Sequence, residues 1–204
     1  MKIIDLTMPI DENTPVYPGD KPQHIGQQAT IAKDGWNEKR LEFSSHLGTH
    51  IDAPFHMLQG GKKLDEFPME KFMGEAITID ARKTNGRNEI QVDLEKVKES
   101  DIVLFYTGHT KKANNKEFFE NNPVISAQLA RKLAEKKVKI VGIDSYTPDN
   151  SPFVTHKILL GADILIVENL VNIGQLAGKR FKCYILPIKI RDADGAPCRA
   201  IAEL

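Results

Sequence analysis

The sequence predicts a mixed α/β domain that has a mostly β core with a few helices packed on it. Two observations lead to this fold class. Strand-like segments outnumber helix-like segments, and the last third of the chain alternates the two kinds. The 204 residues contain no internal repeat and no low-complexity linker, so we expect one domain over residues 1–204.

The strand candidates are short apolar runs or segments in which polar and apolar residues alternate. They are residues 2–6, 40–44, 75–80, 101–106, 139–144, 163–168, 182–190 and 198–203. Residues 8–23, between the first two candidates, contain several prolines and the turn sequence Pro18-Gly19. Because proline fixes φ and has no amide hydrogen, we expect an extended, turning arm there.

Helices are predicted in three places. Residues 126–137 carry their apolar side chains on one helical face, and Ser126 stands at a position suited to an N-cap. Residues 155–161 have a helical pattern, and residues 92–98 are predicted to form a short helix.

Charge and hydropathy argue against two kinds of partner. Lys and Arg together number 28, as do Asp and Glu, so the chain lacks the basic excess of a nucleic-acid-binding protein. No apolar run approaches the length of a membrane span, and the N-terminus lacks the features of a signal peptide, so we predict a cytoplasmic enzyme. Cys183 and Cys198 form no metal motif and are expected to be buried free thiols, whereas His24 and His109 are expected at the surface.

Half of the histidines and one aspartate lie within one short segment, residues 46–56. These four residues are His46, His50, Asp52 and His56. On an extended chain all four side chains would project to one side, although Gly48 and Pro54 argue against a long regular element. We therefore expect a strand end that passes into a turn, with the imidazoles and the carboxylate converging.

Neutral imidazole and ionised carboxylate are ligands that zinc, manganese and iron accept readily. Two histidines and one aspartate would leave coordination positions open, which is typical of a catalytic metal site. A bound metal lowers the pKa of water from about 15.7 to about 7 and so makes hydroxide available at neutral pH. The segment therefore predicts a hydrolytic site with a divalent metal.

Residues 46–56 resemble the signature His-x-Gly-Thr-His-x-Asp-x-Pro-x-His of the cyclase-like metal-dependent hydrolases, the family of bacterial kynurenine formamidase (arylformamidase) and isatin hydrolase relatives. Every fixed position matches. Residues 5–7 and 14–20 resemble the family's opening, and Gly142-Ile143-Asp144-Ser145 and Glu168-Asn169-Leu170 resemble its second block.

The resemblance implies a swivelling β/β/α fold and a ligand role for five residues. His46, His50 and Asp52 would bind a first metal. Asp52 would bridge to a second metal, whose site His156 and Glu168 would complete. From the residues alone, Glu168 could equally be a strand-end charge and His156 a helix-cap histidine.

The resemblance also implies the chemistry. His56 would donate and accept protons rather than bind metal. Two zinc ions are the expected cofactors, with manganese as the alternative. The expected substrates are small amides such as N-formylkynurenine, or cyclic carbonyl compounds such as isatin and lactones. A homo-oligomer, dimer or tetramer, is expected, in which the N-terminal arm helps to close a neighbour's site.

One position departs from the family pattern. Kynurenine formamidases tend to carry tryptophan where this chain has Tyr17, a position that contacts the aromatic substrate. Tyrosine still offers a flat ring for stacking on an aromatic amide. The sequence leaves open whether Tyr17 or Trp36, the only tryptophan, lines the pocket.

Two alternatives to a hydrolase remain at this point. His50, Asp52 and His156 match the two-histidine, one-carboxylate pattern of non-haem iron oxygenases, although His46 and His56 are then unexplained. The second alternative is a metal-binding domain without enzymatic activity.

Overall fold

The computed structural model describes residues 1–204, and its main element is an eight-stranded sheet in which seven strands close into a barrel. The strands are β1 (Ile3–Asp5), β4 (His50–Asp52), β5 (Met73–Asp80), β6 (Ile102–Tyr106), β7 (Ile140–Ile143), β8 (Leu165–Glu168), β9 (Arg180–Pro187) and β10 (Gly195–Glu203). Their order is β1-β10-β4-β8-β7-β6-β5-β9, and β9 also pairs with β10, which closes the barrel. The predicted mixed α/β class with a mostly β core is confirmed.

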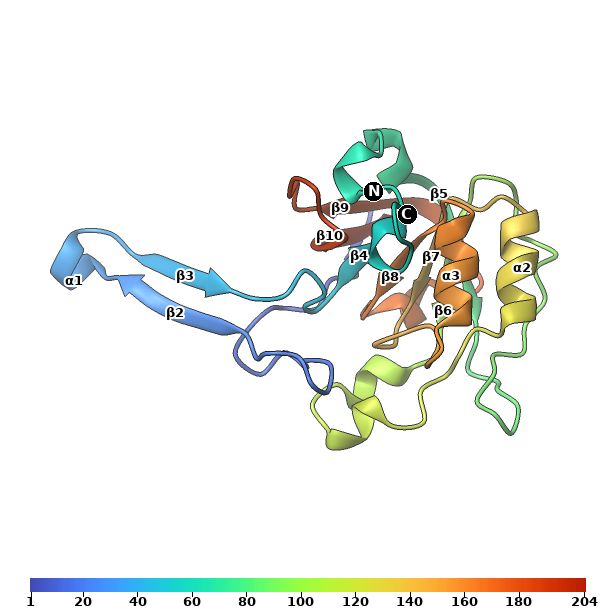
Figure 1. Ribbon diagram of the computed structural model, residues 1–204, viewed down its shortest axis with the longest axis horizontal. Helices are drawn as coiled ribbons and strands as arrows, with labels where there is room; N and C mark the ends of the chain where they lie inside the picture. The colour runs from blue at the N-terminus through green and yellow to red at the C-terminus, as the bar shows by residue number, and fades with distance from the viewer.

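Two helices cover one side of the barrel. Strands β5 to β8 are parallel neighbours, and helices α2 (Ala127–Glu135) and α3 (Val154–Gly161) form the crossovers from β6 to β7 and from β7 to β8. Figure 1 shows the two helices side by side on the outer face of these strands. Ser126 caps α2 as predicted, because its hydroxyl accepts a hydrogen bond from the Leu129 amide at 3.2 Å. Neither helix is long and apolar enough to cross a membrane, and the same is true of α1, described below.

The core has two apolar layers that follow from the alternation of side chains along each strand. In β6, Ile102 and Leu104 point into the barrel, whereas Val103 and Phe105 pack beneath the helices. The strands under the helices are therefore buried on both faces, which explains their unbroken apolar sequence. Cys183 and Cys198 are buried and unpaired, as predicted.

Short 3-10 helices connect many of these elements. They are η1 (Pro54–His56), η2 (Leu64–Glu66), η3 (Met69–Phe72), η4 (His109–Lys112), η5 (Lys116–Phe119) and η6 (Ile173–Leu176). The prediction of a helix over residues 92–98 was wrong, since the segment forms turns. There the Asp93 carboxylate accepts a hydrogen bond from the Glu95 amide, a local bond that competes with helix formation.

A two-stranded hairpin projects from the barrel as a long arm (Figure 1). It consists of β2 (His24–Ala29) and β3 (Glu38–Glu42), joined through the short helix α1 (Ile31–Asp34). Residues 40–44 were predicted as a strand, and β3 covers most of that range, but β2 was missed. Every residue of β3 is exposed. Trp36 lies near the tip with 58% of its surface exposed, and His24 is exposed as expected.

Candidate metal centre

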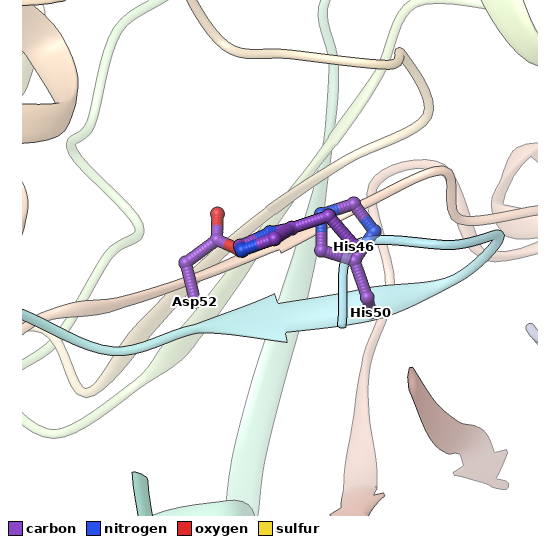
Figure 2. Close-up of side chains that lie close together, drawn as sticks. All are labelled: His46, His50 and Asp52. Atoms are coloured by element: carbon purple, nitrogen blue, oxygen red, sulfur yellow. The ribbon is translucent and has the colours of Figure 1, made fainter. Parts of the chain in front are cut away.

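The pairing of β4 with β8 brings two of the predicted ligands together. These strands are antiparallel, and His50 lies opposite Glu168. Directly opposed residues place their side chains on the same face of a sheet, and Asp52, two residues after His50, shares that face. Figure 2 shows the Asp52 carboxylate and the imidazoles of His46 and His50 gathered on one side of β4.

His46 reaches the same place from the loop before β4, and Gly195 makes room for it. A β-carbon built on Gly195 would lie 3.0 Å from Cε1 of His46 and 2.8 Å from the carbonyl oxygen of Ile51. Gly195 is the β10 neighbour of Asp52. A larger side chain at this position would therefore push His46 away from the carboxylate.

His156 comes from the first turn of α3, about a hundred residues later in the chain. Asp149 holds this turn through one carboxylate oxygen, which accepts hydrogen bonds from the amides of Thr155 at 2.6 Å and His156 at 3.3 Å. Its other oxygen lies 2.5 Å from Nδ1 of His156. The Asp149 side chain therefore fixes both the start of α3 and the orientation of the His156 imidazole.

The inner atoms of the five predicted ligands form two overlapping groups. Nδ1 of His46 and Nε2 of His50 lie 2.9 Å and 3.4 Å from Oδ1 of Asp52. Nε2 of His156 lies 3.3 Å from Oε1 of Glu168 and 4.0 Å from Oδ2 of Asp52. Within each group, His46-His50-Asp52 and Asp52-His156-Glu168, the ligand atoms lie within 4.8 Å of one another. The two groups share Asp52.

Each histidine of these groups has its outer nitrogen held by an acceptor. Nε2 of His46 lies 2.8 Å from Asp194, and Nδ1 of His50 lies 2.9 Å from the Gly48 carbonyl oxygen. His156 uses Asp149 in the same way. An N–H donated outward leaves the inner nitrogen with its lone pair free, which is the usual arrangement of a metal-binding histidine.

The Asp52 carboxylate provides the test of whether a cation fits. Asp52 is only 1% exposed, and neither of its oxygens has a hydrogen-bond partner of suitable geometry. The polar groups around it are the imidazoles of His46, His50 and His156, so the buried charge is balanced only by protons on those rings or by a cation between them. Imidazole and carboxylate ligands without cysteine suit zinc, manganese or iron. The residues therefore fit a divalent metal.

The protonation of the site opposes metal binding at low pH. Burial alone would lower the pKa of His46, but the carboxylates of Asp194 and Asp52 outweigh burial and raise the pKa to about 10. For His156, the effects of Asp149 and Glu168 likewise exceed that of burial and raise the pKa to about 10. A metal must displace these protons, so its affinity falls as the pH falls.

Comparison with known proteins places the chain in a family. A family model described as "Putative cyclase" matches residues 4–150. Kynurenine formamidase of Bacillus cereus is 32% identical over 202 residues, which cover 97% of this chain and 95% of that protein. The chain belongs to the cyclase family.

Solved structures agree with this assignment. A predicted metal-dependent hydrolase from Bacillus stearothermophilus is 28% identical to this cyclase, with a TM-score of 0.83 and coverage of 98% and 97% of the two chains. Isatin hydrolase A from Labrenzia aggregata, bound to benzyl benzoate, is 25% identical, with a TM-score of 0.85 and coverage of 98% and 93%. The protein is a metal-dependent hydrolase, as the sequence predicted, rather than an oxygenase or a metal-binding domain without activity.

A pocket of about 230 Å³ is lined by four of the five predicted ligands. Its lining comprises His46, His50, His56, His156 and Glu168, the aromatic residues Tyr17, Phe118, Phe119, Tyr146 and Phe153, and Pro15, Asp20, Met57, Thr147 and Asn169. Tyr17 thus lines the pocket, and Trp36 does not line it. Most of the aromatic lining was not predicted, because these side chains come from separate loops.

His56 lies at the edge of the ligand cluster, on η1. Its ring centroid lies 4.1 Å from that of His46, and its Nδ1 lies 3.4 Å from Oδ2 of Asp194. Burial lowers the pKa of His56, so the neutral imidazole can accept a proton at neutral pH. These three residues form a further group that could hold a metal. The catalytic role of His56 and the ligand roles of the other five residues therefore stay predictions.

The sequence did not reveal the acceptors Asp149 and Asp194, because neither lies in the signature segment. His109 was predicted at the surface, and this was wrong. It is buried, with Nε2 donating to the Phe118 carbonyl oxygen at 2.7 Å, and it stacks on the Phe118 ring. Its local sequence looks like a loop, and only the fold of η4 against η5 buries it.

Replacing Asp149 with asparagine is expected to weaken metal binding about 10- to 100-fold, because His156 loses the carboxylate that orients it. Competitive titration against a zinc-binding dye measures the change. Asp163→Asn, an exposed position after the other end of α3, is the control and should keep the wild-type affinity. Unchanged affinity in Asp149→Asn would show that Asp149 only caps the helix.

Proposed function

We propose that this cyclase hydrolyses the carbon–nitrogen bond of a small aryl amide, with N-formyl aryl amides as the first candidates and cyclic amides of the isatin type as the second. One observation carries the proposal. The ligand cluster forms the floor of a pocket whose walls are aromatic rings, so a carbonyl group at the floor would have its aryl substituent among those rings. Kynurenine formamidases and isatin hydrolase among the relatives support both candidates.

We assign the metal ligands as two overlapping sets. His46, His50 and Asp52 hold one ion, and Asp52, His156 and Glu168 hold the second. Zinc is the proposed metal and manganese the alternative. When bound, such a metal supplies a water of lowered pKa and polarises a carbonyl oxygen.

Side chains of the protein carry out the remaining steps. His56 takes a proton from the attacking water and delivers it to the nitrogen that leaves, since a neutral imidazole in the pocket is suited to both transfers. Asp194, 3.4 Å from Nδ1 of His56, orients the ring. Tyr17, half exposed, contacts the aryl group and excludes water from it.

A hydrolysis screen tests the proposal. The metal-loaded protein is offered N-formylkynurenine, formanilide, isatin and simple lactones, and the metal content of the same sample is assayed. We expect turnover of at least one aryl amide and up to two metal ions per chain. A fully loaded protein that cleaves none of the amides would refute the proposed reaction.

The projecting arm supports the predicted homo-oligomer. Ile31, Trp36 and Leu41 lie on the hairpin with 57–65% of their surfaces exposed. Apolar side chains held away from the body of the protein are suited to contact with a second copy. We therefore propose a dimer or tetramer held by the arm, and a monomer by light scattering would contradict it. The two unpaired cysteines agree with the proposed cytoplasmic location.

A further inference from the structure

Apart from its histidines, the charged residues that line the pocket are all acidic. Of the residues that line it, none is a lysine or an arginine. Its carboxylates are Glu168, which lies among the histidines of the floor, and Asp20, which is exposed on the solvent side. On the solvent side of the pocket, away from the histidines of the floor, an anionic substituent on the substrate would therefore find a carboxylate and no lysine or arginine.

Asp20 is held at the pocket by the turn that also presents Tyr17. The Asp20 amide donates to the Tyr17 carbonyl oxygen at 3.0 Å, and Gly19 between them has a φ of +102°, which glycine adopts without strain. No salt bridge or side-chain hydrogen bond engages the Asp20 carboxylate, so it is free to pair with a ligand.

Asp20 lines the pocket together with a cluster of three aromatic rings. The Tyr17 centroid lies 6.3 Å from that of Phe119 and 6.0 Å from that of Tyr146, and those two lie 5.0 Å apart. The negative faces of aromatic rings attract organic cations, and this attraction adds to that of a carboxylate. The rings also stack on an aryl group, so the wall can hold a ring that bears a cationic substituent.

We propose that Asp20 is a specificity residue of the cyclase and that, within the proposed aryl-amide hydrolysis on which this inference rests, the preferred substrate carries an amine or quaternary ammonium group and no carboxylate. A cationic substituent pairs with Asp20 and the Tyr17 ring. A carboxylate there meets a like charge and gains no compensating pair.

The test uses formanilides with a trimethylammoniomethyl, a neopentyl or a carboxymethyl group at the meta position. The first two have nearly the same shape and differ in charge. We expect kcat/KM for the cationic compound to exceed that for the carboxylate about tenfold, from one exposed charge pair and one cation–π contact. Asp20→Asn should cut the ratio of the cationic to the neutral compound about threefold. Asp20→Lys should reverse the preference.

Glu117→Gln is the matched control. It removes one negative charge from the neighbouring η5 segment at an exposed position outside the pocket lining, and it should leave the ratio unchanged. A wild-type preference for the carboxylate compound would overturn this inference alone. The same holds if the kcat/KM ratios are equal in wild type and both Asp20 variants. No turnover of any of the three compounds by a protein that cleaves another aryl amide would also overturn this inference alone, whereas no turnover of any aryl amide would overturn the proposed function and this inference with it.

Discussion

Replacing Asp52 with alanine is expected to remove the bound metal and to lower kcat/KM by at least about 10⁴-fold. Asp52 belongs to both groups of converging ligands, so its loss opens both at once. The water then returns from a pKa of about 7 towards that of bulk solvent. A factor of 10⁴ in rate corresponds to about 5.5 kcal/mol in the activation free energy. This is less than the free energy that corresponds to the full change in the pKa of the water.

Elemental analysis and hydrolysis of formanilide on the same preparations measure both effects. Asp192→Ala, an exposed position in the loop before β10, is the control and should keep metal and activity. After treatment with a chelator, circular dichroism should show the same secondary structure for wild type and Asp52→Ala, because the backbone of β4 stays paired with β8 and β10. An Asp52→Ala protein that keeps two metal ions per chain would contradict the assignment of the shared ligand.

Replacing His56 with alanine is expected to keep the metal and to lower kcat about 10²- to 10⁴-fold, the usual contribution of a general acid–base group. The reason is its place in the site. His56 lines the pocket and lies beside Asp194 and His46, outside the two groups that share Asp52. Metal content, kcat and KM are compared with those of wild type, and His24→Ala on the exposed arm is the control.

The competing role for His56 is also visible in the structure, because His46, His56 and Asp194 form a third group that could hold an ion. If His56 were a ligand there, the alanine variant would lose metal in step with activity. Asp194 also holds Nε2 of His46, so Asp194→Asn should slow turnover and weaken the His46-His50-Asp52 group together, while the Asp52-His156-Glu168 group stays loaded.

The site was predictable where its residues are neighbours in the chain. His46, His50 and Asp52 lie within one short segment, in which the extended backbone of β4 brings His50 and Asp52 to one face and the turn before it brings His46. Asp149 and Asp194 were not predictable, because each meets its histidine only through the fold. Asp194 lies 148 residues from His46, and no local pattern links them.

The same distinction between local and long-range information applies to the fold. The buried strands β5 to β8 were found because apolar runs mark strands covered on both faces. Closure of the barrel was not foreseen, since it depends on β9 pairing with both β5 and β10. Strand β2 was missed because hydrophobic patterns report burial, and most of the arm is not buried in this chain.

Because β4 lies between β8 and β10, the candidate metal site is completed by residues that are made long after the signature segment. Asp52 gains its last neighbour, Gly195, and His46 its acceptor, Asp194, only when the final strand is in place. A nascent chain that has already exposed the whole signature segment therefore still lacks a finished binding site. A chain cut before residue 194 would therefore keep the signature intact but leave His46 without the carboxylate that holds its Nε2.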